Sequence, residues 1–363
     1  MKRVFLVPGF FGFANLGELR YFGHVHRLLV RRFEDAGIEA SVHQVRTLPT
    51  SSLKRRTQRL LEAVAAASSP GDTIDLVGHS SGGLDARMFA SPGARIDSEL
   101  EPWAQQVRSV LTVATPHLGT PSAEAFATAS GKRMLRLISA MTLVVLRQGS
   151  IPLTVLLEAG HLFRRVDGLL EDDAPGLVDE VFRGLLDQLD SDRRSEVAAF
   201  FAEVGEDQAL LPQIAPDAMD AFNVGTGDRP GVRYGCVLTR ARRPGLHGVM
   251  DAGLRPYAQA SNALYVACHR LASGGPEYAP AATALAPFWS DLTPADNDGM
   301  VPTASQAWGR VVAAVDADHL DVIGHFAGED AVPPHYDWIR TGTGYSRSAF
   351  EATWNACFEF LVS

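Results

Sequence analysis

The sequence predicts an α/β protein with a mostly parallel central sheet, helices on its faces and a helical insertion. Three observations predict this fold class. Short apolar segments alternate with amphipathic helical segments from residue 3 to residue 115. Glycine-rich turns follow several of the apolar segments, and from 121 to 220 the pattern changes to helix alone. Strands that are apolar along their length are typical of parallel sheets with both faces covered.

The first half of the chain alternates strand and helix without interruption. Residues 16–36 carry apolar side chains at helical spacing, and Gly37 stands where such a helix ends. A second helix is expected to begin at Ser51 or Ser52 and to finish before Pro70. The expected order is strand 3–9, helix 16–36, strand 39–45, helix 52–67, strand 74–78, helix 82–90 and strand 108–115.

The second half contains the insertion and the remaining strands. No strand pattern occurs over 121–220, whereas 232–239 and 310–317 are apolar enough to resume the sheet. A final helix carries one apolar face, made of Phe350, Trp354, Phe358 and Leu361. We find no repeat, low-complexity tract or interdomain linker. We therefore expect a single domain over 1–363, with 121–220 forming a helical cap or lid.

Composition places the chain among ordinary soluble globular proteins. Of its 363 residues, 46% are hydrophobic and 21% charged, and the net charge of −9 argues against nucleic-acid binding. Three scattered cysteines build no disulfide framework, and the first residues lack the features of a secretion signal, so a cytoplasmic location is expected, with secretion by another route as the alternative. The most apolar segment, 134–160, is broken by charged residues and a proline, so no transmembrane span is predicted.

The stretch IDLVGHSSGGLDAR, residues 74–87, runs from an apolar strand through a glycine-bracketed turn into a helix. A G-x-S-x-G turn in this strand–turn–helix setting holds its central serine on a sharp, strained backbone with its oxygen exposed. Gly78, Gly82 and Gly83 supply the space for that turn. Ser80 is therefore the expected nucleophile, and Ser81 is the rival hydroxyl, displaced from the centre of the bracket.

A serine nucleophile needs a base and an orienting acid, which should follow it in the order acid, then histidine. His319 comes directly after the last strand in VDADHLDVIGH, with His325 and His335 as alternatives. For the acid, TPADNDGMVP offers Asp298, which precedes a glycine in a tight turn. Asp296 and Asp291 are expected to cap or solvate the same loop.

The oxyanion of the reaction needs two backbone N–H groups. Ser81 supplies one as the residue after the nucleophile, and Phe10 in VPGFFGF, after the first strand, supplies the other. ATPHLGT closes a strand at the same edge of the sheet, where His117 is expected to form a wall of the site. The expected substrate pocket comprises Phe11, Phe13, His79, His117 and Leu118.

These residues resemble the bacterial lipase and esterase branch of the α/β-hydrolase superfamily. The PGFFG loop, GHSSGG, TPHLGT, NDGMV and DHLD all occur in the order of that family, over roughly 1–120 and 230–325. The resemblance implies an α/β-hydrolase fold, ester hydrolysis through an acyl-enzyme with Ser80, Asp298 and His319 as triad, and an oxyanion hole from Phe10 and Ser81. It also implies a helical lid after the TPH-x-G segment.

The sequence departs from the family pattern in three places. Pro8 replaces the usual histidine before the glycine of the oxyanion loop, which alters the loop but leaves the main-chain donor. Asp321 matches one calcium ligand of some relatives, but no aspartate stands around 270–280, where the second is expected. No cofactor is therefore required, and the missing ligand argues against calcium. The third departure is the lack of a signal peptide and of paired cysteines.

We expect a carboxylic-ester hydrolase of the lipase or esterase type that acts on acyl esters or lipids, including those at a lipid–water interface. Two alternative functions remain open. A polyester depolymerase or an acyltransferase would use the same triad on another substrate or acceptor. A catalytically inactive lipid-binding protein would keep the scaffold without needing all three residues.

Overall fold

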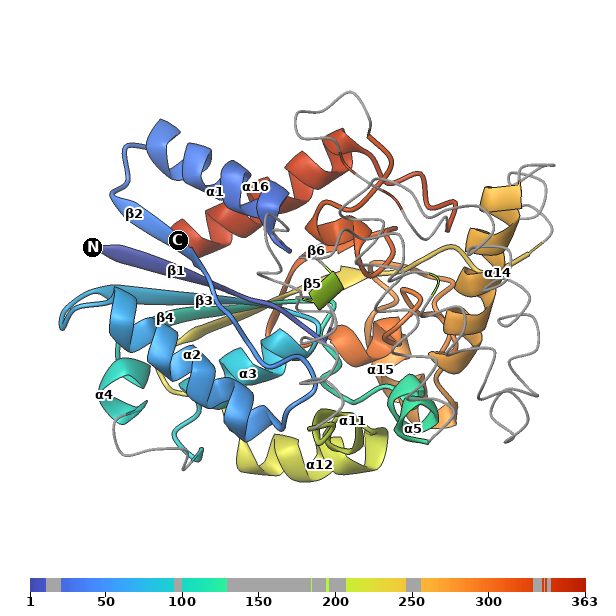
Figure 1. The fold of residues 1–363 in the computed structure, drawn as a ribbon, viewed down its shortest axis with the longest axis horizontal. Helices are drawn as coiled ribbons and strands as arrows, with labels where there is room; N and C mark the ends of the chain where they lie inside the picture. Colours follow the sequence, from blue (N-terminus) through green and yellow to red (C-terminus); the bar gives the residue numbers. More distant parts are fainter. Residues whose placement is uncertain are drawn as a thin grey trace.

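The computed structural model describes residues 1–10, 21–94, 100–128, 184, 194–195, 207–245, 256–328, 335, 337 and 341–363. Its centre is a sheet of six parallel strands in the order β2-β1-β3-β4-β5-β6 (Figure 1). The strands are β1 (Lys2–Val7), β2 (Ala40–Gln44), β3 (Thr73–His79), β4 (Val107–Val113), β5 (Arg233–Thr239) and β6 (Arg310–Val315). All six expected strands are confirmed.

Helices cover both faces of the sheet (Figure 1). On one face lie α1 (Gly23–Asp35) and α16 (Arg347–Val362), and on the other lie α2 (Leu53–Ala67), α3 (Ser81–Ala90) and the short α4 (Leu100–Ala104). The start of α2 follows from its cap, since the Ser52 hydroxyl accepts from the Arg55 N–H. The C-terminal end of α1 is followed by Gly37, whose φ of 65° lets the chain leave the helix without strain.

The side chains of β1 explain why the sheet needs cover on both faces. Val4 and Leu6 pack into the larger core with α1 and α16, whereas Phe5 and Val7 pack into the second core with α2 and α3. All four are fully buried. Alternate side chains of a strand point to opposite faces, so a strand with four consecutive apolar residues must lie between two layers.

The segment after β4 is helical where the structure describes it. α5 (Pro121–Ala127) and α11 (Leu210–Gln213) lie within the expected insertion, and α12 (Pro216–Gly225) begins within it and ends after residue 220. Most of 121–220, and with it most of the predicted cap, lies outside the described residues, as does the whole of the apolar segment 134–160. In the part of the chain that is described, no helix combines the length and hydropathy needed to cross a bilayer.

Between β5 and β6 the structure contains helices that the sequence analysis does not predict. They are α14 (Pro256–Leu271), the 3-10 turns η1 (Pro276–Tyr278) and η2 (Thr303–Gln306), and α15 (Ala279–Ala284). The buried positions of α14 include Ala267 and Cys268, which are too small to give a strong apolar stripe. A further turn, η3 (Asp321–Ile323), follows β6.

Candidate active site

Ser80 stands at the junction of β3 and α3 with a φ of 56° and a ψ of −136°. Among the described residues, only Ser80 and Ala114 combine a side chain with a positive φ. Such a backbone costs of order 1–3 kcal/mol and persists only where its surroundings enforce it. Here the Ser80 N–H donates to the Val113 carbonyl at 2.9 Å and its carbonyl accepts from the Gly83 N–H at 3.0 Å. The expected sharp turn is therefore present.

The glycines around Ser80 leave no space for a side chain. A Cβ on Gly78 would lie 2.5 Å from the Gly83 Cα, and one on Gly82 would lie 2.7 Å from the Pro8 carbonyl oxygen. Heavy atoms do not approach so closely without displacement of the backbone. The start of α3 thus packs directly against the turn and against the residues that follow β1, which brings Ser80 to the carboxyl edge of the sheet.

The residues after β1 include Phe10, the expected oxyanion donor, and we call residues 8–10 the oxyanion loop after that expectation. A Cβ on Gly9 would lie 2.9 Å from the Ser80 Oγ, so only glycine allows this loop to run beside the serine. Phe10 follows and is 9% exposed. Phe11 and Phe13 lie outside the described residues. The oxyanion loop and the N-terminus of α3 thus pack against Ser80 on two sides.

His319 and Asp298 are hydrogen-bonded to each other in the interior. The His319 Nδ1 lies 2.8 Å from the Asp298 Oδ2, and the two residues are only 4% and 1% exposed. Because the carboxylate accepts, the proton of the imidazole sits on Nδ1 and leaves Nε2 with a lone pair. A backbone hydrogen bond of 3.0 Å from the His319 N–H to the Asp298 carbonyl fixes the same pairing.

Four further donors surround the Asp298 carboxyl. Its Oδ1 accepts from the N–H groups of Met300 and Val301, and its Oδ2 accepts from the Thr239 hydroxyl and the Gln306 amide. Hydrogen-bond donors of this kind stabilise a negative charge that is removed from water. The carboxyl is therefore held in one orientation, with Oδ2 aimed at the imidazole.

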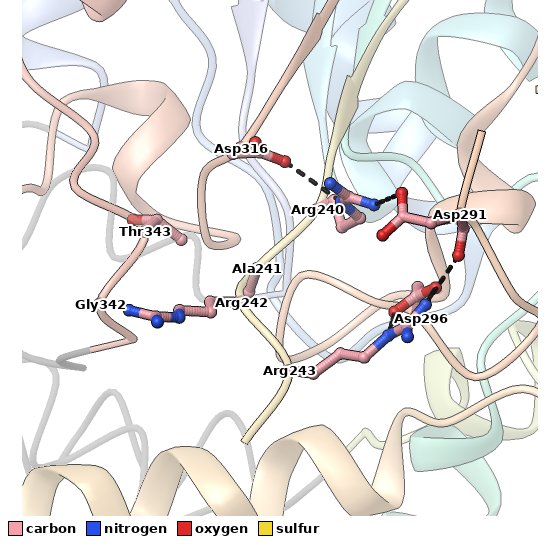
Figure 2. Close-up of a pocket in the computed structure, with 9 residues that line it drawn as sticks. All are labelled: Arg240, Ala241, Arg242, Arg243, Asp291, Asp296, Asp316, Gly342 and Thr343. Carbon is pink, nitrogen blue, oxygen red and sulfur yellow. Dashed lines mark hydrogen bonds and ion pairs between the residues drawn. The ribbon is translucent and has the colours of Figure 1, made fainter. Parts of the chain in front are cut away.

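The competing acids, Asp296 and Asp291, line a polar cavity together with arginines of the segment after β5 (Figure 2). Asp296 pairs with Arg243 and accepts from the Thr293 N–H, while Asp291 is exposed and pairs with Arg240. These ion pairs line a polar cavity of about 400 Å³ that contains none of Ser80, Asp298 and His319. As expected for residues that stabilise the loop, Asp296 and Asp291 anchor it to the segment after β5.

Neither rival histidine approaches Asp298. The His325 Nε2 lies 3.1 Å from the Tyr21 carbonyl, and burial lowers the pKa of His325 to about 4. His335 stacks between His24 and Phe326, with its Nδ1 2.7 Å from the Gly324 carbonyl. Both side chains therefore have structural contacts.

The structure describes three of the predicted pocket residues, His79, His117 and Leu118. His79 is fully buried and both of its ring nitrogens are hydrogen-bonded, to Tyr21 and to the His319 carbonyl, so it presents no free edge to a substrate. His117 is likewise fully buried between Arg87 and Thr112. Leu118 packs against the cluster around Tyr278.

A buried ion pair that was not predicted from the sequence holds the oxyanion loop. The Arg56 guanidinium of α2 and the Asp85 carboxylate of α3 are both fully buried and lie 2.7 Å apart. Arg56 Nη2 also donates to the Pro8 carbonyl at 2.8 Å, which ties the loop to both helices. The signal was present, because Arg56 shares a helical face with Leu53 and Leu60, where an apolar residue is expected.

Three carboxylates gather beside His319. Oxygens of Asp318, Asp321 and Asp337 lie within 4.8 Å of one another. Burial raises the pKa of Asp318 to about 7, and burial together with the charges of Asp318 and Asp337 raises the pKa of Asp321 well above its usual range. Clustered carboxylate oxygens suit Ca²⁺, which would relieve their repulsion. From the sequence, the second calcium ligand was expected around 270–280. The structure instead places Asp318 and Asp337 next to Asp321.

Comparison with known proteins places this arrangement in context. Neither a model of a known protein family nor a curated protein matches the sequence. Solved structures do match over nearly the whole chain. EstA from Clostridium botulinum shares 17% identity at a TM-score of 0.54, covering 98% of this chain and 86% of its own. Lipase 1 from Pelosinus fermentans shares 16% identity at a TM-score of 0.52, covering 99% of this chain and 98% of its own.

A third match is the Staphylococcus hyicus lipase, which shares 16% identity at a TM-score of 0.51 and covers 99% of this chain and 95% of its own. Likeness at this level of identity concerns the fold. The parallel sheet and its flanking helices are the architecture that this likeness concerns. The chain therefore has the α/β-hydrolase fold that the sequence predicted.

Proposed function

We propose that this chain is a carboxylic-ester hydrolase in which Ser80, His319 and Asp298 act as a catalytic triad. The observation that carries the proposal is the 2.8 Å contact between His319 and Asp298 at the edge of the sheet where Ser80 is held in its strained turn. Two of the structural neighbours named above are lipases, which supports the same reaction class. An inactive lipid-binding protein would have no use for this pairing.

The proposed reaction follows from the proton positions. His319 Nε2, which carries the lone pair, removes the proton from Ser80 as Oγ attacks the ester carbonyl carbon. Asp298 holds the imidazole in this tautomer and stabilises the charged form. The proton then passes to the leaving alcohol as the carbon–oxygen bond breaks, and the acyl group stays on Ser80. Water repeats the sequence and releases the acid.

The developing oxyanion requires two donors. In the proposal these are the backbone N–H groups of Phe10 and Ser81, which lie on the two segments that flank the serine. Gly9 is in contact with the Ser80 side chain, and Ser81 is the first residue of α3. A helix N-terminus favours negative charge, which adds to the stabilisation. Removal of one such donor typically costs about 10²–10³ in kcat.

Substrate profiling tests this function and separates lipase from esterase. The full chain should hydrolyse p-nitrophenyl acyl esters, and a series from acetate to palmitate, soluble and emulsified, reports the acyl-chain preference. A rate that rises sharply once the ester forms an emulsion identifies a lipase; a preference for short soluble esters identifies an esterase. Turnover of polyhydroxyalkanoate, or acyl transfer to an added alcohol in place of water, would favour the alternative activities. No turnover and no labelling by a fluorophosphonate at several pH values would reject the triad.

We also propose that Asp318, Asp321 and Asp337 bind Ca²⁺, which would hold the loop after β6 beneath His319. At a hundredfold excess over its Kd, a ligand of the folded state adds about 2.7 kcal/mol to stability. The melting temperature should therefore rise in CaCl₂ relative to EGTA, and Asp321→Asn should remove that rise. Asp316→Asn, in an exposed ion pair outside the cluster, serves as control. Equal melting temperatures in CaCl₂ and EGTA would contradict calcium binding.

A further inference from the structure

We propose that Tyr21 and His79 are positioning residues that fix His319 relative to the oxyanion loop through a chain of buried hydrogen bonds. The inference rests on the proposed function, because it assigns His319 the part of the base. The chain joins three segments that are far apart in the sequence: the loop after β1, the turn before the nucleophile and the loop after β6. No step of the reaction passes through Tyr21 or His79 themselves.

The first link is the imidazole of His79. Its Nε2 lies 2.8 Å from the His319 carbonyl oxygen and its Nδ1 lies 2.6 Å from the Tyr21 hydroxyl. A carbonyl only accepts, so Nε2 donates and Nδ1 must accept from the Tyr21 O–H. Burial, with His319 beside it, holds the pKa of His79 well below its ordinary value. The ring therefore stays neutral, in the one tautomer that serves both contacts.

The second link is the Tyr21 hydroxyl, which has a partner on each side. It donates to His79 and accepts from the backbone N–H of Gly9. Tyr21 is 3% exposed, and burial raises its pKa far above the usual value, so it keeps the proton that His79 needs. The direction of every bond in the chain is thereby set, from the Gly9 N–H through Tyr21 and His79 to the His319 carbonyl.

The chain matters because of what its ends touch. Gly9 packs against the Ser80 side chain, and His79 is the residue directly before Ser80. The ring centroids of His79 and His319 lie 4.7 Å apart. Asp298 orients the His319 ring at Nδ1, whereas His79 holds its backbone, so the two contacts together determine where Nε2 lies. A displacement of 1 Å from productive geometry can cost about 10²-fold in rate.

Tyr21→Phe tests the chain with the smallest change in shape. It leaves the Gly9 N–H without its acceptor and the His79 Nδ1 without its donor. We expect kcat for a p-nitrophenyl ester to fall about 10- to 100-fold while KM stays within about threefold. Tyr345→Phe is the matched control, because it deletes a buried tyrosine hydroxyl that donates to Thr353 instead. Its kcat should equal that of the wild type.

His79 is tested by two substitutions that differ in one property. His79→Gln retains a side-chain N–H near the place of Nε2, whereas His79→Leu fills the space without a donor. The glutamine variant should recover about tenfold of the kcat lost by the leucine variant. If both lose kcat equally although both are folded by circular dichroism, the donor role of His79 is wrong. If the leucine variant does not fold, the comparison of Tyr21→Phe with Tyr345→Phe decides.

The outcomes for the two proposals are distinct. A wild-type protein without esterase turnover or fluorophosphonate labelling refutes the proposed function. An active wild type whose Tyr21→Phe variant has the same kcat as Tyr345→Phe refutes the positioning chain and leaves the triad standing. A Tyr21→Phe variant with raised KM and unchanged kcat would make Tyr21 a substrate contact, which also overturns the inference.

Discussion

We expect Ser80→Ala to lower ester hydrolysis to a small residual rate and to leave the fold intact. The Oγ is the only atom that forms the acyl bond in the proposed reaction, so its loss should lower kcat by about 10³- to 10⁶-fold, to the residual rate that binding and the oxyanion donors supply. The fold survives because the Ser80 N–H and carbonyl, which hold the turn, are unchanged. Steady-state turnover of a p-nitrophenyl ester and a far-ultraviolet circular dichroism spectrum measure the two effects.

A matched serine separates loss of the nucleophile from loss of a buried hydroxyl. Ser109 lies on the neighbouring strand β4, is fully buried and donates to Asp75. Ser109→Ala should lose stability and keep turnover. A fluorophosphonate should label the wild type and Ser109→Ala, and the modified peptide should carry the group on Ser80. Label on Ser81, or turnover retained in Ser80→Ala, would show that the nucleophile is assigned wrongly.

Asp298→Asn should have the second largest effect, a fall in kcat of about 10⁴-fold. An amide in place of the carboxylate can turn its N–H toward His319, which moves the imidazole proton from Nδ1 to Nε2 and leaves no base facing the serine. The substitution also mismatches the donors that surround both oxygens, so some stability should be lost. Turnover at saturating ester and thermal unfolding followed by dye fluorescence report the two losses separately.

Asp296→Asn is the control for this loss, because Asp296 belongs to the same loop and is equally buried. It weakens the ion pair with Arg243 and so should lower the melting temperature. Its kcat should stay within about threefold of the wild type, since it does not touch His319. Equal losses of kcat in the two variants would mean that the loop as a whole, and no particular carboxylate, supports activity.

Local features of the chain made the fold predictable. The consecutive apolar residues of β1, Val4 to Val7, pack alternately into the two cores, and such a run indicates a covered parallel sheet without knowledge of what covers it. The turn at Ser80 was equally readable, because glycines at 78, 82 and 83 are steric requirements of the turn itself. By contrast, α14 was missed because its buried face is built partly from small side chains.

For the site, the tight-turn dipeptide Asp298-Gly299 favoured Asp298 over Asp296, and the position directly after the last strand favoured His319 over His325. The partners of buried polar groups could not be predicted in this way. His79 was expected in the substrate pocket, although its two hydrogen bonds reach residues 58 and 240 positions away. Asp321 was left without a second ligand because Asp337 reaches it only through the fold.

The sequence by itself determined the sheet, the strained turn and the residue types available for chemistry, because these depend on hydrophobicity and on steric limits between near neighbours. Only the tertiary structure decided which nitrogen of His79 donates, what Arg56 holds and which carboxylates meet. The reason is that hydrogen bonds and ion pairs act over about 3 Å. The packing of distant segments determines which groups lie within that distance, and a local sequence pattern does not contain this information.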